Sequence, residues 1–131
     1  MGQTMILEVK EKALAAREAL AAMNRLTTEQ KNRALLAMAD ALVRERDAII
    51  AANREDLARG EANGTSRSLL DRLMLNEDRI AGIAEGLRQI VELPDPIGEV
   101  LETFERPNGL RIEKVRVPLG VVGMIYEARP N

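Results

Sequence analysis

The sequence predicts a mostly α-helical chain that finishes with a β-hairpin and one further strand. Apolar residues recur at helical spacing up to about residue 93, and the first prolines, in Pro94-Asp95-Pro96, end that pattern. Asn108-Gly109 then separates two runs of strand composition, which is a strong hairpin signal. We therefore divide the chain into a helical region (1–93), a hairpin arm (94–118) and a terminal segment (119–131).

Two helices are predicted in the first 46 residues. The first covers residues 4–24. The second starts at Thr27, where Thr27 and Gln30 have the spacing of a capping box, a pair of side chains that bonds free N–H groups at a helix start. The expected buried residues are Val9, Ala13, Ala16, Leu20 and Met23 in the first helix, and Leu35, Met38 and Leu42 in the second.

Three more helices are predicted before Pro94. A break near Arg46-Asp47 makes Asp47 a candidate cap for a helix that Gly60 or Gly64 closes in the left-handed conformation. A short helix, residues 66–73, follows, and Asn76 caps the last one. The expected buried residues are Ile49, Ile50, Ala52 and Leu57 in the third helix, and Ile80, Ile83, Ala84, Leu87, Ile90 and Val91 in the last.

The predicted hairpin joins residues 99–105 to residues 110–117. In the second strand Leu110 and Ile112 share one face, whereas Val115 and Val117 share the other. Side chains alternate strictly along a strand, so this pattern indicates either a bulge near Glu113-Lys114 or a strand partly covered on both faces.

The terminal segment carries the most apolar run of the chain. Val121–Ile125 has the composition of a strand that is buried on both faces and therefore needs neighbours on both sides. A natural C-terminus is usually polar, so we expect this strand to begin a domain whose remainder is absent. Its open edge would pair with another copy or cause aggregation.

Composition excludes several classes of function. With 19 basic and 21 acidic residues, the chain lacks the basic surplus that nucleic-acid binding needs. No apolar run approaches the roughly 18 residues of a membrane span, and no secretory signal is present, so we expect a cytoplasmic protein without a membrane or nucleic-acid partner. Cysteine and histidine are absent. Disulfides, thiolate or imidazole metal sites and Cys–His or Ser–His catalytic pairs are thereby excluded, and we expect no metal.

Two short stretches near the end could carry chemistry. Gly120 lies before the apolar run and Gly123 lies within it. A dinucleotide-binding turn needs three glycines after a strand, so close backbone packing is favoured instead. Glu127, Arg129 and Asn131 follow that run. Together they could bind an anion or donate to an oxyanion, or they could form a polar loop with an internal ion pair.

Four quoted stretches carry a family resemblance. The N-terminal region of glutamate-5-semialdehyde dehydrogenase, also called gamma-glutamyl phosphate reductase, resembles the stretches EQKNRALLAMADAL, AANREDLARGEANG, LLDRLMLNEDRIAGIAEGLRQIVELPDPIG and VRVPLGVVGMIYEARPN, of which YEARPN is the most specific part. The resemblance runs from about residue 8 to the end and covers the first third of such an enzyme. It implies an α/β, aldehyde-dehydrogenase-like fold for the whole enzyme.

The resemblance implies an activity in proline biosynthesis. The family reduces gamma-glutamyl phosphate to glutamate-5-semialdehyde with NADPH and releases phosphate, through a cysteine thiolate that forms a thioester. A covalent intermediate divides one difficult step into two, and the cofactor carries the hydride. This chain has no cysteine, and the resemblance implies that the nucleophile lies beyond Asn131, so we expect the 131 residues alone to be inactive.

The resemblance also suggests site residues. By that similarity Asn131 would donate to the oxyanion, and the superfamily's hairpin implies a homo-oligomer joined through the hairpin arm or the terminal strand. Independently of the resemblance, we expect Arg129 to contact a phosphate or carboxylate, because a guanidinium binds such anions. The residues expected to line the NADPH cleft are Ile125, Tyr126, Glu127 and Ala128.

Two other functions compete with the enzyme. One is a helical interaction module with a partner groove on residues 35–42 and 80–91, which leaves the terminal apolar run unexplained. The other is an RNA-binding arm, in which the basic residues of 106–116 are neutralised by Glu102, Glu105 and Glu113.

Overall fold

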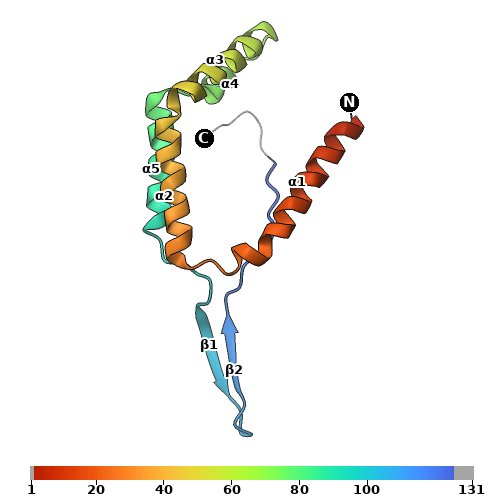
Figure 1. Ribbon diagram of the computed structural model, residues 1–131, viewed down its shortest axis with the longest axis vertical. Helices are drawn as coiled ribbons and strands as arrows, with labels where there is room; N and C mark the ends of the chain where they lie inside the picture. The colour runs from red at the N-terminus through yellow and green to blue at the C-terminus, as the bar shows by residue number, and fades with distance from the viewer. Residues whose placement is uncertain (1, 126–131) are drawn as a thin grey trace. The chain divides into compact units, whose positions relative to one another are not determined.

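The computed structural model describes residues 2–125, with side chains from residue 7 onward (Figure 1). The described part has two compact units, one made of the residues up to Thr28 with Pro94–Gly123, and one that contains Glu29–Leu93. The elements are α1 (Gly2–Met23), α2 (Thr28–Arg44), α3 (Arg46–Ala62), α4 (Arg67–Leu73), α5 (Glu77–Val91), β1 (Val100–Glu105) and β2 (Arg111–Val115). The mostly helical fold with a C-terminal hairpin is therefore confirmed.

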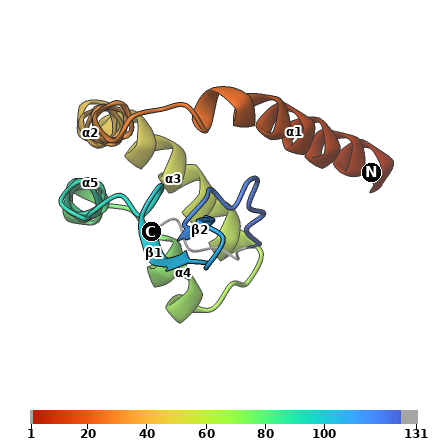
Figure 2. The ribbon, with the colours of Figure 1, turned by 90° about the horizontal axis from the view of Figure 1, so that it is seen from below.

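In the helical unit, α2 and α5 lie side by side and are seen nearly end-on in Figure 2. Arg88 Nη2 of α5 lies 3.3 Å from Asp40 Oδ1 of α2, and α3 contacts both α4 and α5. The buried apolar residues of the described part are Ala39, Ile80 and Ala84. Two of the three are alanine, so little apolar volume is enclosed.

The core position on α2 differs from the prediction. Ala39 is fully buried, whereas Met38 is 49% exposed. Leu35 and Leu42 are half-buried as expected. Positions 38 and 39 are both neighbours of Leu35 on a helix surface, and the sequence pattern favoured the larger apolar residue. The buried face of α2 instead contains the residues at positions 35, 39 and 42.

The start of α3 also differs from the prediction. Glu45 alone separates α2 from α3, and Asp47 lies in the first turn of α3. The break is slight because the Glu45 N–H still donates to the Ala41 carbonyl and the Ile49 N–H to the Glu45 carbonyl. No helix start is left free at Asp47 to be capped. Ala52, expected in the core, is exposed, and the adjacent Asn53 is buried.

The other helix boundaries agree with the sequence. The second helix begins at Thr28, directly after the expected cap at Thr27, and Gly64 has the left-handed conformation (φ +74°) beyond the end of α3. Ser66 and Asn76 are the caps of α4 and α5, and Asn76 Oδ1 accepts a hydrogen bond of 2.8 Å from the Arg79 N–H. These side chains replace backbone partners that a helix start lacks.

Asn76→Ala is expected to lower the free energy of unfolding by about 1 kcal/mol, because the Arg79 N–H loses its acceptor. Asn76→Asp should retain most of the stability, since a carboxylate also caps and is favoured at a helix N-terminus. Chemical denaturation followed by helical circular dichroism compares the two variants. Equal stability of the alanine and aspartate variants would contradict a capping role.

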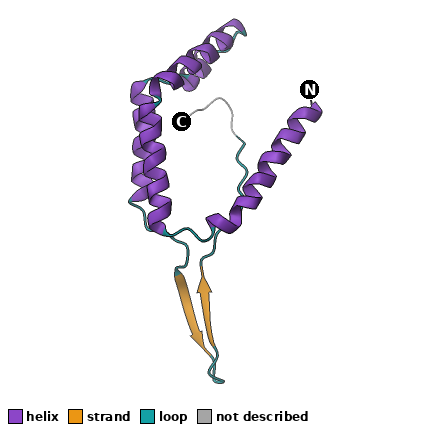
Figure 3. Ribbon diagram, in the orientation of Figure 1, coloured by secondary structure: helices purple, strands orange, loops and turns teal. Residues whose placement is uncertain are grey.

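The hairpin is drawn in orange in Figure 3. Phe104 lies opposite Ile112, and Thr103 opposite Glu113. The register shifts between Val100 and Glu102, so that Leu101 is an extra residue on β1. The bulge expected near Glu113-Lys114 is thus on the other strand. Ile112 and Val115 lie on opposite faces of β2 because that strand alternates regularly.

Apart from the hairpin, the described segments outside the helices α2 to α5 are largely exposed. In α1, Leu20 is half-buried, whereas the other members of the expected stripe are exposed. Residues 116–125 form no strand, and Val122, Met124 and Ile125 are exposed. The predicted strand at 121–125 is therefore not found. Such a strand is stable only when neighbouring strands bond its backbone, and among the described residues neither β1 nor β2 pairs with it.

Candidate functional site

Most of the expected site residues lie outside the described part of the chain. Tyr126, Glu127, Ala128, Arg129 and Asn131 are all beyond residue 125. Ile125 itself is fully exposed. The assignment of a cofactor cleft to this segment stays a prediction.

The two glycines of the terminal run are not sites of close packing. A Cβ atom built on Gly120 or Gly123 would meet nothing within 4 Å. Gly120 has φ +98°, a conformation that favours glycine, so its role is to turn the chain. The expectation of close backbone packing at both positions is wrong for the described residues.

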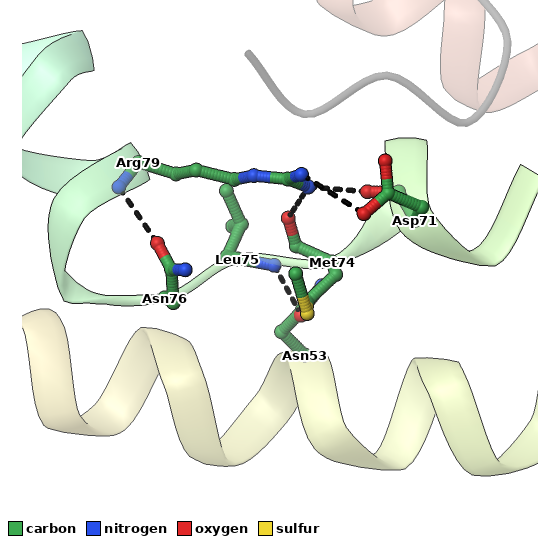
Figure 4. A network of polar contacts seen from close by, with 6 residues as sticks. All are labelled: Asn53, Asp71, Met74, Leu75, Asn76 and Arg79. Carbon is green, nitrogen blue, oxygen red and sulfur yellow. Dashed lines mark hydrogen bonds and ion pairs between the residues drawn. The ribbon is translucent and has the colours of Figure 1, made fainter. Parts of the chain in front are cut away.

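The best-defined polar cluster lies where α3, α4 and α5 meet (Figure 4). Asn53 of α3 is 5% exposed and holds the segment between α4 and α5 with two hydrogen bonds. Its Nδ2 donates to the Leu73 carbonyl (3.0 Å), and its Oδ1 accepts from the Leu75 N–H (2.7 Å). A carboxamide has both a donor and an acceptor, so it pairs with a backbone segment as a neighbouring strand would.

Arg79 fixes the same segment from the α5 side. Its guanidinium donates to the Met74 carbonyl (2.8 Å), to the Asp71 carbonyl, and to the Asp71 carboxylate (3.0 Å). The arginine side chain is 33% exposed and that of Asp71 64% exposed, so solvent screens the ion pair and its contribution to stability is small. The sequence pattern predicted a helix at Asp71 and another at Arg79, but nothing in it indicated that these two side chains lie in contact.

The role of this cluster is to hold α3, α4 and α5 in place. The amide of Asn53 is bonded on both sides, and the Arg79 guanidinium bonds the Asp71 carboxylate and the Met74 carbonyl, so both side chains serve to hold this segment. Among the described side chains no buried nitrogen or oxygen is left without a partner. Residues 7–125 also contain no group of three His, Cys, Asp or Glu side chains that could hold a metal ion.

Two hollows lie on the surface of the helical unit. One, of about 510 Å³, runs along α5 and is lined by Arg79, Gly82, Ile83, Gly86, Leu87 and Ile90. The other, of about 340 Å³, lies beside the cluster described above and is lined by Ile50, Arg54, Leu57, Met74, Leu75, Asn76 and Glu77. The lining of both is mainly apolar, which is typical of surfaces that receive another apolar surface.

An exposed ion pair on α1 lowers the pKa of one carboxyl group, that of Glu8. Lys12 Nζ donates to Glu8 Oε1 at 2.6 Å, and this hydrogen bond together with the lysine charge lowers the pKa of the Glu8 carboxyl. The pair is spaced i, i+4 on the helix surface and points to no site.

The chain matches known proteins over most of its length. It is 58% identical over 125 residues to the gamma-glutamyl phosphate reductase of Moorella thermoacetica, and 54% identical over 129 residues to that of Halothermothrix orenii. Each match covers 95% of this chain, and it covers 30% and 31% of the respective relative. No protein-family model matches the chain. No helix in residues 2–125 is long and apolar enough to cross a membrane.

Two solved structures have the same fold over this part. The crystal structure of gamma-glutamyl phosphate reductase from Thermotoga maritima gives a TM-score of 0.82 at 40% identity, covering 85% of this chain and 27% of that one. The enzyme of the same name from Saccharomyces cerevisiae gives a TM-score of 0.75 at 34% identity, covering 81% and 27%. Sequence and fold together show that the chain belongs to the gamma-glutamyl phosphate reductase family and spans about 30% of the length of its curated relatives.

Proposed function

We propose that the chain serves in the NADPH-dependent reduction of L-glutamyl 5-phosphate to L-glutamate 5-semialdehyde, a cytoplasmic step of proline biosynthesis. The observation that supports this function is the 58% identity, over 95% of the chain, to a gamma-glutamyl phosphate reductase. In the thioester route that the resemblance implies, a thiolate displaces phosphate from the acyl carbon, and the thioester would then accept a hydride supplied by the cofactor and release the thiolate as the aldehyde forms.

The chain's part in this reaction is to hold a cofactor-lining segment on a helical scaffold. Cysteine and histidine are absent from all 131 residues, so a thiolate nucleophile must come from elsewhere. The 131 residues alone are therefore expected to show no reductase activity. The proposed cofactor contacts are Ile125, Tyr126, Glu127 and Ala128.

A chimera tests the proposed function. In it, these 131 residues replace the matching part of the Moorella thermoacetica reductase. Activity is measured in reverse, as NADPH formed from glutamate 5-semialdehyde, phosphate and NADP⁺. Phosphate-dependent activity within about tenfold of the parent, a loss of about 1.4 kcal/mol, supports the proposal. A folded chimera without activity would contradict it.

Two variants of the chimera separate the proposed roles of Arg129 and Asn131. Arg129→Ala is expected to raise the KM for phosphate about tenfold with little change in kcat, because a bidentate anion contact is lost. Asn131→Ala is expected to lower kcat about a hundredfold, the usual effect of removing an oxyanion donor. If Arg129→Ala leaves the KM for phosphate unchanged, arginine does not bind the anion.

The proposed partner is a second copy of the chain, joined through the hairpin arm or the terminal run. Within the described residues β1 and β2 form a two-stranded sheet, so the outer edge of each strand is unpaired there. Unpaired edges are templates for strand addition. Light scattering of the chain at micromolar concentration checks this, and a strictly monomeric mass would remove the proposal.

A further inference from the structure

The chain contains two asparagine–glycine pairs, and they lie in different structural settings. Asn63-Gly64 follows the last turn of α3, whereas Asn108-Gly109 lies at the tip of the hairpin, between β1 and β2. All four residues are exposed to solvent. Glycine has no side chain to shield its backbone nitrogen, so this nitrogen can attack the side-chain amide of the preceding asparagine. The structure around each pair decides how readily it does so.

The tip of the hairpin is held by few bonds. The Gly109 N–H donates to the Arg106 carbonyl (2.8 Å), and the Arg106 N–H donates to the Leu110 carbonyl (2.9 Å). In the described part of the chain, β1 and β2 form a two-stranded sheet, and neither contacts α1 of the same unit. A two-stranded hairpin without further partners is marginally stable in water. Brief opening of the tip therefore frees the Gly109 nitrogen at low cost.

The end of α3 is held more firmly. Three consecutive N–H groups bond carbonyls of the last helical turn: Asn63 to Arg59, Gly64 to Glu61 and Thr65 to Gly60. The same turn packs on α4, since a Cβ atom built on Gly60 would lie 2.8 Å from Leu70 Cδ2. Freeing the Gly64 nitrogen disrupts this capped and packed helix end, so it costs more than opening the hairpin tip.

The asparagine side chain at the tip has a donor in the right place. The Leu110 N–H donates to Asn108 Oδ1 at 3.1 Å. When a nucleophile adds to the Asn108 Cγ atom, negative charge develops on this same oxygen. A backbone N–H directed at such an oxygen stabilises the developing charge. The hairpin turn thus favours attack on Asn108 as well as exposing it.

We propose that Asn108 is a site of spontaneous deamidation and that the fold protects Asn63 from the same reaction. The Gly109 nitrogen loses its proton to hydroxide and forms a bond to Asn108 Cγ. The side-chain nitrogen takes up a proton, its bond to Cγ breaks, and it leaves as ammonia, so that a cyclic succinimide remains. Water then opens either carbonyl–nitrogen bond of the ring, which gives aspartate or isoaspartate. The reaction needs no cofactor or substrate, so it is independent of the proposed function.

The two products affect the hairpin differently. Aspartate adds a negative charge to the tip but keeps an oxygen that can accept from the Leu110 N–H. Isoaspartate inserts a methylene group into the backbone of the turn. Because turn length sets the register of a hairpin, isoaspartate is expected to break the hydrogen bond from the Arg106 N–H to the Leu110 carbonyl.

The test compares the two asparagines within one molecule. The 131-residue chain is incubated at mildly alkaline pH in native buffer and, separately, in concentrated guanidinium chloride. Peptide mass spectrometry gives the fraction of each site converted from amide to acid, and electron-transfer fragmentation distinguishes isoaspartate from aspartate. Asn108→Gln is the matched control, because glutamine keeps the amide but would have to close a larger and less favourable ring. Helical circular dichroism is recorded alongside to follow the fold.

In native buffer Asn108 should convert at least about tenfold faster than Asn63, because opening the helix end breaks more bonds. The rate at Asn108 should rise with pH, since the attacking nitrogen must first lose its proton. In denaturant the two sites should convert at similar rates, because each asparagine precedes glycine. Asn108→Gln should remove the fast conversion and leave the rate at Asn63 unchanged.

Two results would overturn the inference. One is conversion of Asn63 in native buffer at a rate equal to or above that of Asn108, because the fold then gives Asn63 no protection. The other is the same ratio of rates in denaturant as in native buffer, because the difference would then come from the local sequence and not from the structure.

Discussion

Asn53→Ala is expected to lower the free energy of unfolding of the helical unit by about 2–5 kcal/mol. The substitution removes the only side-chain partner that the structure gives the Leu73 carbonyl and the Leu75 N–H. Each part-buried backbone group left without a partner costs about 1–3 kcal/mol. Water reaches this position poorly, because Asn53 is 5% exposed. Denaturant unfolding and amide exchange at Leu75 measure the loss.

Two further variants define the origin of that loss. Asn53→Asp keeps the acceptor for the Leu75 N–H but loses the donor to the Leu73 carbonyl, so its stability should lie between those of the wild type and the alanine variant. Asn63→Ala, at the exposed C-cap of the same helix, controls for the change in composition and should alter stability by less than about 0.5 kcal/mol. Equal effects at positions 53 and 63 would show that the two hydrogen bonds contribute little.

Ile80→Ala should destabilise the same unit by about 3 kcal/mol. Ile80 is 2% exposed and is the largest fully enclosed side chain of the described residues, so truncating it removes a large share of a small core. Deleting a buried isoleucine loses its transfer free energy and leaves a cavity, for about 2–5 kcal/mol in total. The expected value is in the middle of this range because an exposed groove lies nearby and the site can partly collapse. Thermal and denaturant unfolding measure the change.

Ile90→Ala is the matched control for this prediction. It makes the same chemical change on the same helix, but Ile90 is 48% exposed. The expected loss is below about 1 kcal/mol, because less apolar surface returns to water. Ile80→Val should lie between, at about 1 kcal/mol. If Ile80→Ala and Ile90→Ala were equally mild, the core around α5 would be loosely packed.

Local signals in the sequence predicted most of the helical architecture. The cap at Asn76, the left-handed Gly64 and the period of α5 each depend on neighbouring residues, so a single chain carries the information. The family resemblance was confirmed for the same reason, since it rested on ordered stretches of residues. The sequence did not show which of two adjacent residues is buried, because packing against the rest of the fold decides this. On α2, Met38 was expected in the core, but Ala39 is buried there instead.

Features that depend on distant residues could not be predicted. Asn53 pairs with backbone groups 20 and 22 positions away, and a buried asparagine has no periodic signature. The bulge at Leu101 is a property of two strands in register, which neither strand shows alone. The composition of residues 121–125 indicates a strand only where partner strands exist. The proposed site residues from Tyr126 to Asn131 lie outside the described residues.

The polar contacts of the helical unit have a consequence for biosynthesis. Asn53 reaches Leu73 and Leu75, and the longest contact, from Asp40 to Arg88, spans 48 positions. Every one of these partners precedes the hairpin in the chain. Synthesis is slow compared with the closing of such loops. As the polypeptide leaves the ribosome, the contacts among α2 to α5 can therefore form without waiting for β1 and β2 to pair.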